Sequence, residues 1–292
     1  MCSTSIYIAG RYNKYSRNLS QSPWIDKNDA RIKHSVQELI EDGLNKHLSF
    51  NESIFSACGR EDVDVKMLGN GRPFVFRIKD LMCPSQLENN KILNEVQEYV
   101  NSKHGSKIHL RDLQVVTKQD VDKYMRDTDE DKTKEYRALC CCSRKLTQAD
   151  IDKINSIENL EIEQKTPIRV LHRRSLAVRR RKIYKMSIER AKINDSDILK
   201  ENELDHAYIL TLSTEAGTYI KEYVHGDFGR TKPNLGSLLK ECVADLVELD
   251  VMQVHLCWPP PIYAESKNEA KTTDAQLASD NDSYLHDSPI TR

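Results

Sequence analysis

The sequence lacks several features that would assign it to a special class of protein. No run of residues approaches the roughly 18 apolar positions that a membrane-spanning helix needs. The N-terminus has no basic segment followed by an apolar one. Charge of one sign is also missing, because 44 Lys and Arg oppose 45 Asp and Glu, for a net charge of −1. We therefore expect a protein that neither contacts a membrane nor is secreted, and the bulk charge identifies no partner.

Cysteine pairs with metal-binding spacing are absent as well. The eight cysteines contain no C-x-x-C pair and no histidine at a matching distance, so we expect no metal site. Cys140, Cys141 and Cys142 are consecutive, which is awkward for paired disulfides. We interpret them as reduced thiols that serve as small apolar residues at the end of a strand, and we expect a nuclear or cytoplasmic protein.

The composition is globular except at the C-terminus. Hydrophobic residues make up 38% of the 292 residues and charged residues 30%, which suits one large domain or two of ordinary size. Residues 264–292 contain few large apolar side chains and more Asp and Glu than Lys and Arg. We expect this acidic tail to be disordered and residues 1–263 to form the folded part.

The densest positive charge lies between Lys165 and Lys185 (KTPIRVLHRRSLAVRRRKIYK), which we call the basic stretch. Its arginines and lysines have apolar and small neighbours and no acid among them. Such a cluster is typical of a surface that binds a phosphate backbone. The alternatives are a solvated face of a strand or helix, or a localisation signal.

Hydrophobic periodicity predicts a mixture of helices and strands. Hairpins are more frequent than a strict alternation of strand and helix, which favours an α+β fold with a largely antiparallel sheet. The region 63–78 is predicted as two strands joined by a tight turn at Gly69–Pro73, and Thr147 as a helix N-cap. The predicted helices are 30–48, 86–102, 147–155 and 234–247, with 219–228 as helix or loop. The other predicted strands are 108–117, 134–142, 204–212 and 250–256, with 169–187 as a long strand or a hairpin.

The first chemical cluster is Gly59-Arg60-Glu61-Asp62-Val63-Asp64. Alternation along an extended segment would place Asp62 and Asp64 on one face and Glu61 on the other. A carboxylate after a glycine and beside an arginine could be held ionised as a nucleophile, a base or a metal ligand. A turn with ordinary solvated acids is the alternative.

Two further clusters contain cationic and aromatic side chains. In Gly217–Lys221, the lysine could neutralise a carboxylate, and the glycines and cations of Gly226–Lys232 could approach phosphates. The pair Tyr136-Arg137 at the start of a predicted strand is either core packing or a platform for a base.

Together these clusters resemble the pseudouridine synthase family. Gly59-Arg60-Glu61-Asp62 resembles its G-R-x-D motif, Tyr136 its active-site tyrosine, and Gly217–Lys221 its G-T-Y-I-[RK] motif. Longer matches resemble the archaeal and eukaryotic branch that modifies T-arm uridines at tRNA positions 54 and 55. These matches are GREDVDVKMLGNGRPF, KEYRALC, TPIRVLHRRSLAVR and AGTYIKEYVHGDFGRTKPNLGSLL.

The resemblance implies a two-lobed α+β catalytic domain with mainly antiparallel sheets and a central RNA-binding cleft. It implies that Asp62 is the nucleophile and that Tyr136 stacks on the target base and assists proton removal from C5. Lys221 would pair with Asp62, and Ile220 would line the uracil pocket. We expect a monomer that acts on tRNA without a cofactor, a metal or a membrane, because a carboxylate nucleophile and a stacking tyrosine suffice.

The basic stretch and the family motifs together predict the RNA contacts. Relatives carry an N-terminal THUMP-type region, which we expect this chain to lack, as an isoform, a fragment or a mispredicted gene product would. A non-catalytic RNA-binding or RNA-processing factor and a protein-interaction module that uses the acidic tail are the rival hypotheses. Retention of Asp62, Tyr136 and Lys221 favours the enzyme. The predicted RNA-binding residues are Arg60, Arg72, Arg137, His172, Arg173, Arg174, Arg179, Arg230 and Lys232.

Overall fold

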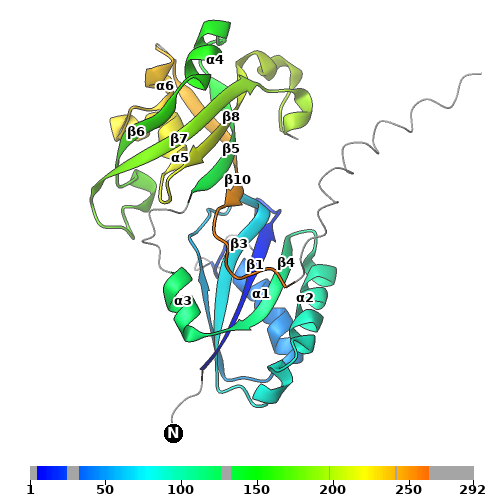
Figure 1. Cartoon of the computed structure of the whole chain (residues 1–292). Coiled ribbons are helices and arrows are strands. Elements are labelled where there is room, and N and C mark those ends of the chain that lie inside the picture. The colour runs from blue at the N-terminus through cyan, green and yellow to red at the C-terminus, as the bar shows by residue number, and fades with distance from the viewer. Residues whose placement is uncertain (1–4, 25–32, 126–132, 197, 241, 263–292) are drawn as a thin grey trace, which may run out of the picture.

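The computed structural model describes residues 5–24, 33–125, 133–196, 198–240 and 242–262. Figure 1 shows two lobes, one above the other, that meet at β10 (Ala244–Val254). The elements of the N-terminal lobe are β1 (Ser5–Lys14), α1 (Val36–His47), β2 (Glu52–Ala57), β3 (Lys66–Lys79), the short 3-10 helix η1 (Pro84–Leu87), α2 (Lys91–His104), β4 (Ile108–Val116) and α3 (Lys118–Tyr124).

The C-terminal lobe begins with β5 and returns through β10 to the N-terminal lobe. Four of its elements are short 3-10 helices, among them η2 at the start of the basic stretch. Its elements before β10 are β5 (Lys134–Cys142), α4 (Gln148–Asn155), β6 (Glu158–Lys165), η2 (Ile168–Val170), β7 (Val178–Arg190), η3 (Ile193–Asp195), η4 (Glu201–His206), β8 (Ala207–Thr214), α5 (Ile220–His225), η5 (Gly226–Gly229), β9 (Thr231–Lys232) and α6 (Leu235–Leu238).

One continuous sheet runs through both lobes in the order β4-β1-β3-β10-β5-β8-β7-β6-β9, with β2 paired to β3. The lobes are joined where β3 and β10 pair in parallel, at Asp250 opposite Lys66 and Val251 opposite Met67. The other strand pairs between described residues are antiparallel. The predicted α+β class with mainly antiparallel pairing is therefore confirmed, and the two lobes share their sheet.

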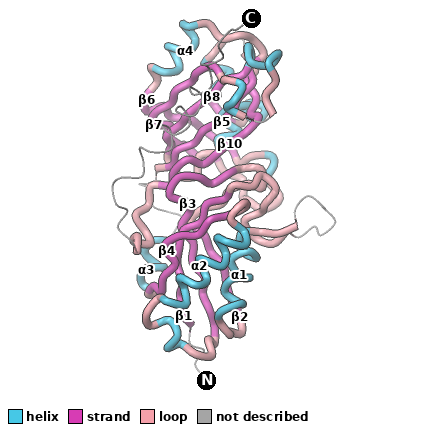
Figure 2. Tube along the Cα trace, turned by 90° about the vertical axis from the view of Figure 1, so that its right-hand side faces the viewer, coloured by secondary structure: helices cyan, strands magenta, loops and turns pink. Residues whose placement is uncertain are grey.

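The helices α1 and α2 lie side by side against one face of the N-terminal part of the sheet (Figure 2). Ser35 caps α1 by accepting a hydrogen bond from the amide of Glu38, whose side chain accepts one from the Ser35 amide. This reciprocal pair satisfies donors that a helix start leaves free. The apolar side of α1 is buried with that of α2 in the main core. The predicted helix at 30–48 is therefore present from Val36.

The predicted hairpin at Gly69–Pro73 is wrong, because β3 continues through it as a single strand of 14 residues. The glycines lie in a bulge, where the register against β1 shifts between Tyr12 and Lys14. Gly69 and Gly71 have φ of +55° and +73°, and a Cβ on either would clash with a backbone carbonyl of β10 or β1. Glycine is needed here for close strand contact, and the turn-like Gly-Asn-Gly sequence reflects a bulge.

Other elements have different bounds in the structure from those predicted. The helix expected at 234–247 is only the four-residue α6, because Ala244 already belongs to β10, which must bridge β3 and β5. The strand expected from 169 begins at 178, and β6 was not predicted. In contrast, β5 has the predicted bounds, and Thr147 caps α4 as expected.

The described cysteines agree in part with the expected placement at the end of a strand. Cys140 and Cys142 point into the core at the end of β5 while Cys141 is exposed, and the described cysteines are free thiols. No described helix is long and apolar enough to cross a membrane. The acidic tail predicted at 264–292 lies outside the described residues.

Candidate active site

The loop between β2 and β3, residues 58–65, carries Asp62, and we call it the aspartate loop. It is not the extended segment that alternation predicted, because Val63 and Asp64 form a turn. Gly59 enters the loop with φ of +85°, and a Cβ there would lie 2.8 Å from Nη1 of Arg72. Glycine therefore permits the arginine to pass beneath the loop.

A buried ion pair supports the aspartate loop from below. Nε of Arg72 lies 2.6 Å from Oε2 of Glu61, and both side chains are almost fully buried. Tyr12 donates a hydrogen bond of 2.7 Å to the other carboxylate oxygen, and Nη1 of Arg72 donates one of 2.7 Å to the carbonyl of Cys58. Paired buried charges hold the loop in place, because separating a pair would leave a buried charge without a partner.

Lys14 of β1 holds the aspartate loop through its backbone. Its buried ammonium donates to the carbonyl oxygens of Leu19, Asp62 and Val63 at 2.9, 3.1 and 2.8 Å. Burial lowers the pKa of Lys14 to about 8, against the opposing pull of nearby carboxylates, the strongest being Glu61. The lysine therefore titrates close to physiological pH.

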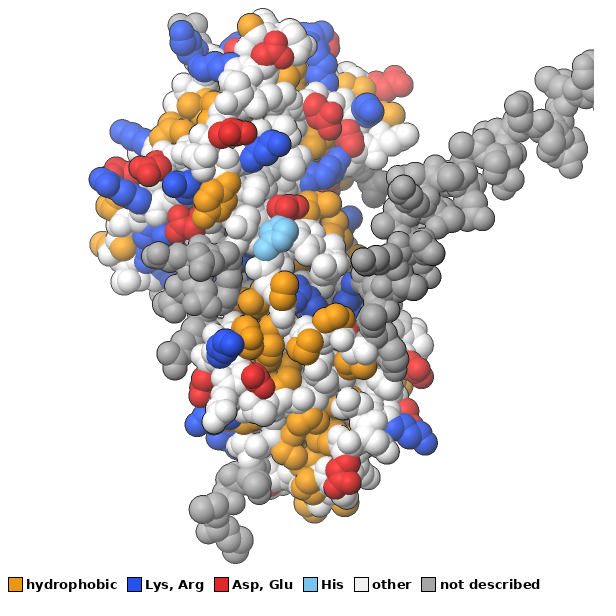
Figure 3. Space-filling model, in the orientation of Figure 1, with side chains coloured by type: hydrophobic (Ala, Val, Ile, Leu, Met, Phe, Trp, Pro, Cys, Tyr) orange, Lys and Arg blue, Asp and Glu red, His pale blue; other side chains and the backbone are white. Residues whose placement is uncertain are grey.

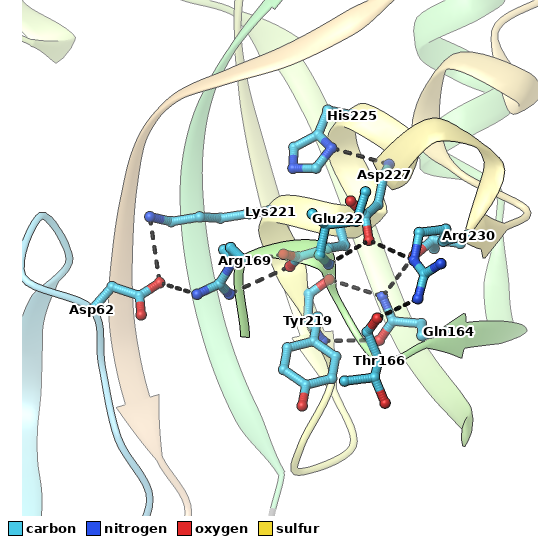
Figure 4. A network of polar contacts seen from close by, with 12 residues as sticks. Asp62, Gln164, Thr166, Arg169, Tyr219, Lys221, Glu222, His225, Asp227 and Arg230 are labelled. Carbon is cyan, nitrogen blue, oxygen red and sulfur yellow. Dashed lines mark hydrogen bonds and ion pairs between the residues drawn. The ribbon is translucent and has the colours of Figure 1, made fainter. Parts of the chain in front are cut away.

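The side chain of Asp62 meets two cations from the other lobe (Figure 4). Nη1 of Arg169 donates to its Oδ2 at 2.7 Å, and Nζ of Lys221 lies 3.4 Å from the same oxygen. The predicted pairing of Lys221 with Asp62 is therefore present, although Lys221 lies closer to Asp64, at 2.9 and 2.8 Å from its two oxygens.

Arg169 is itself held by a buried carboxylate. Its Nε donates to Oε1 of Glu222 at 2.7 Å, and Glu222, on α5, is only 2% exposed. Burial lowers the pKa of Arg169, but the hydrogen bonds and charges of Glu222 and Asp62 more than compensate, so the pKa is raised. Arg169 thus bridges α5 of the C-terminal lobe to the aspartate loop of the N-terminal lobe as a permanent cation.

A cavity of about 430 Å³ opens above Asp62, a size within the range of ligand sites. Tyr136 and Ile220 supply apolar walls, and Tyr136 is 8% exposed. Burial raises the pKa of Tyr136 to about 12, so its hydroxyl stays protonated near neutral pH. The charged residues that line the cavity are Arg60, Glu61, Asp62, Arg72, Lys134, Arg169, Arg173, Arg174, Arg179, Arg181 and Lys221.

Comparison with known proteins identifies the family. The profile of the family described as "Pus10, C-terminal" matches residues 7–255. The chain belongs to this family. It is 46% identical over 260 residues to the tRNA pseudouridine synthase Pus10 of Mus musculus, covering 88% of this chain and 46% of that protein.

Relatives from more distant organisms match the same part of the chain. The tRNA pseudouridine synthase Pus10 of Pyrococcus furiosus is 35% identical over 251 residues, which cover 85% of this chain and 57% of that protein. The chain spans about half the length of these Pus10 relatives. Among solved structures, one from a Cbf5-Nop10-Gar1 complex aligns with a TM-score of 0.42 at 16% identity, over 84% of this chain and 48% of that chain.

Several predicted RNA-binding residues lie at the cavity of this Pus10-family chain. Arg60, Arg173, Arg174 and Arg179 line it. His172 is exposed in the same loop as Arg173 but does not line the cavity. Arg230 and Lys232 also lie outside the lining, and Arg230 donates to the carbonyl of Thr166 at 2.7 Å.

Two predicted RNA contacts have side chains that are engaged within the protein. Arg72 lines the cavity but is only 2% exposed, and it donates to Glu61 and to the carbonyl of Cys58, so it supports the aspartate loop. Arg137 follows Tyr136 in β5 but does not line the cavity. Its Nη2 lies 2.6 Å from Oδ1 of Asp195. Alternation of side chains in a strand places the two neighbours on opposite faces.

Sequence reasoning missed Arg169, Glu222 and Lys14 as site residues. Arg169 belonged to the basic stretch, but its sequence separation of 107 from Asp62 and 53 from Glu222 gave no sign of the contacts. Glu222, directly after Lys221, was the signal available in the sequence for such a contact. If its carboxylate is buried, it needs a cation as its partner. On the face shown in Figure 3, basic and acidic side chains alternate over the C-terminal lobe, so the stretch does not stand out as one patch there.

Proposed function

We propose that this chain is the catalytic part of a tRNA pseudouridine synthase that isomerises a T-arm uridine, at position 55, with position 54 as a second target. The observation that carries the proposal is the placement of Asp62 between Arg169 and Lys221 at a cavity lined by Tyr136 and Ile220. The names of the Pus10 relatives support the same assignment.

The isomerisation breaks two bonds of the uridine and forms two, so it balances without a cofactor. Asp62 attacks the flipped uridine or its ribose and forms a transient bond to it, and the bond between N1 and C1′ breaks. The uracil turns, C5 joins C1′, and the bond to Asp62 breaks again, while the proton lost from C5 is balanced by one gained at N1. A positioned carboxylate and a pocket for the free base are the groups that this exchange needs.

The two carboxylate oxygens of Asp62 differ in their contacts with Arg169 and Lys221. Both Arg169 and Lys221 approach Oδ2, and no described residue donates to Oδ1. We assign Oδ1 as the oxygen that attacks, because its lone pairs are not engaged by a cation. The contacts of Oδ2 with the two cations then keep the carboxylate oriented while a substrate is bound.

The surroundings fit a flipped nucleotide of tRNA as the substrate. Tyr136 offers an aromatic face, Ile220 an apolar wall, and the arginines around them offer donors for phosphates. We assign to Tyr136 stacking on the target base through its aromatic ring and assistance in the removal of the proton from C5. We expect the chain to act as a monomer in the nucleus or cytoplasm.

The test uses the two neighbouring carboxylates of the aspartate loop. The purified chain is incubated with an unmodified tRNA transcript, and pseudouridine is mapped at base resolution. We expect product at a T-arm uridine, no product with Asp62→Asn, and product with the matched control Asp64→Asn, because both carboxylates contact Lys221 but only Asp62 contacts Arg169.

Each alternative has its own outcome. Near-normal turnover by Asp62→Asn would remove the nucleophile from the proposal. Tight tRNA binding without product in the unmodified chain would favour the non-catalytic RNA-binding factor. Product at a uridine outside the T-arm would keep the chemistry and reject the position.

A further inference from the structure

Phe228 is the most exposed large apolar side chain among the described residues, at 96%. It lies in η5, directly after α5, the helix whose first residues Ile220 and Lys221 line the cavity. The six residues of α5 separate the two features by about 9 Å along the helix axis. A fully exposed ring contributes little to folding.

The backbone that presents Phe228 is strained. Four consecutive residues, Gly226 to Gly229, have positive φ, of +78°, +46°, +53° and +79°. Two of them, Asp227 and Phe228, carry side chains that disfavour this conformation. Such strain persists where surrounding contacts impose it, and it clusters at functional sites.

The contacts that impose the conformation are present. Asp227 is 6% exposed, and its Oδ2 accepts a hydrogen bond of 3.3 Å from the amide of Ile168 and lies 3.5 Å from Nε of Arg230. Arg230 also donates to the carbonyl of Thr166 at 2.7 Å. Figure 4 shows this network next to the Arg169–Glu222 pair. The turn is thereby fixed to the same segment that delivers Arg169 to Asp62.

The charge around the ring favours a nucleic acid over a protein. Arg230 and Lys232 follow the turn, and its one acid, Asp227, is buried. Gly226 and Gly229 flank Asp227 and Phe228 in the sequence. A lone aromatic face with cations beside it fits an unpaired base and its phosphates.

We propose that Phe228 is a stacking platform for an unpaired base of the substrate RNA, outside the cavity that holds the reacting nucleotide. This inference rests on the proposed function. The platform lies at the end of α5 opposite the cavity, where a nucleotide flanking the target would pass. Its fixed backbone means that the ring is already in place before RNA binds, which reduces the entropy lost on binding.

The experiment measures affinity and product separately in the full chain. Variants Phe228→Ala and Phe228→Leu remove the aromatic face, and Phe228→Leu keeps an apolar side chain. Phe228→Tyr keeps the ring, and Met82→Ala is the matched control, since Met82 is 74% exposed and does not line the cavity. Affinity for an unmodified tRNA transcript is measured at one fixed salt concentration, with thermal unfolding to verify the fold.

We expect Phe228→Ala and Phe228→Leu to weaken tRNA binding about fivefold to a hundredfold, the range for losing one stacked base. Phe228→Tyr and Met82→Ala should bind as the unmodified chain does. A tRNA carrying 5-iodouridine at single positions should crosslink to the peptide that contains Phe228 from a position other than the target.

Other outcomes overturn the inference in distinguishable ways. If the unmodified chain forms pseudouridine and Phe228→Ala binds equally well, the platform is rejected and the proposed function stands. Equal loss in Phe228→Leu and Phe228→Tyr would reject stacking as the cause. If the unmodified chain binds RNA without forming product, the affinities still decide the platform, and failure to bind RNA would reject both proposals.

Discussion

The aspartate loop and the loop of residues 166–178, which we call the basic loop, contribute to one cavity but are built differently. The aspartate loop rests on buried charges, with Glu61, Arg72 and Lys14 almost fully enclosed. Residues 171–178 of the basic loop are exposed, and its two ends are tied together through Thr166, whose hydroxyl donates to the carbonyl of Ser175 at 2.7 Å.

The difference follows from what each loop has to do. A nucleophile must be held within a fraction of an ångström of its reacting atom, and buried, fully paired polar groups provide that rigidity. Cations that bind a phosphate backbone act over longer distances and work best when exposed to it. We therefore expect changes in the aspartate loop to affect stability and turnover, and changes in the basic loop to affect affinity.

The largest effect is expected at the buried ion pair. Glu61→Gln leaves the buried Arg72 without its counter-charge and should lower the free energy of unfolding by about 3–5 kcal/mol, measured by urea denaturation. The exposed pair of Glu163 with Arg180 is the control, and Glu163→Gln should change stability by less than about 1 kcal/mol. Equal effects would erase the contrast between the two regions.

The next effect concerns the residue that links the loops. Arg169→Lys cannot reach Glu222 and Asp62 together, so Asp62 loses one charge-assisted hydrogen bond of about 1.5–3 kcal/mol. We expect kcat at saturating tRNA to fall about ten- to hundredfold with little change in affinity. The control Arg173→Lys should retain kcat, and a loss of affinity alone in Arg169→Lys would place Arg169 with the phosphate-binding residues.

The pH dependence of Lys14 gives a smaller, signed effect. Its pKa is about 8 in the folded protein and 10.5 ordinarily, so between these values the unfolded chain binds more protons. The contribution of Lys14 to the free energy of unfolding therefore rises with pH in this window. Turnover should fall above about pH 8, because the neutral amine holds the carbonyls of Asp62 and Val63 more weakly.

The measurement is the pH profile of kcat at saturating tRNA. Lys14→Met should be slow and should lack the decline that begins near pH 8 in the unmodified chain. An identical decline in Lys14→Met would assign the titration to another group. The difference in unfolding free energy between the two proteins checks the stability part independently.

The smallest effect is expected from the exposed cations. Arg173→Ala combined with Arg174→Ala should reduce the slope of log affinity against log salt by roughly one unit per lost phosphate contact. Arg180→Ala should change it less, because Arg180 pairs with Glu163 and does not line the cavity. An unchanged slope in the double variant would make the basic loop an ordinary solvated surface.

The elements whose signals are local could be predicted from the sequence alone. Strand β5 and the Thr147 cap of α4 were predicted correctly, because alternation and side-chain capping depend on near neighbours. The motifs around Asp62, Tyr136 and Lys221 likewise identified residues that the fold brings to one cavity.

The features that depend on distant partners could be seen only in the three-dimensional fold. The Gly69–Gly71 segment became a bulge because β1 and β10 pack closely against it, and 244–247 became a strand because β3 and β5 needed a bridge. Arg72 pairs with Glu61, 11 residues away, whereas Arg169 pairs with Asp62, 107 residues away, and with Glu222. An arginine's partner is set by which carboxylate the fold places within hydrogen-bond distance, and contacts across more than a hundred residues leave no local pattern in the sequence.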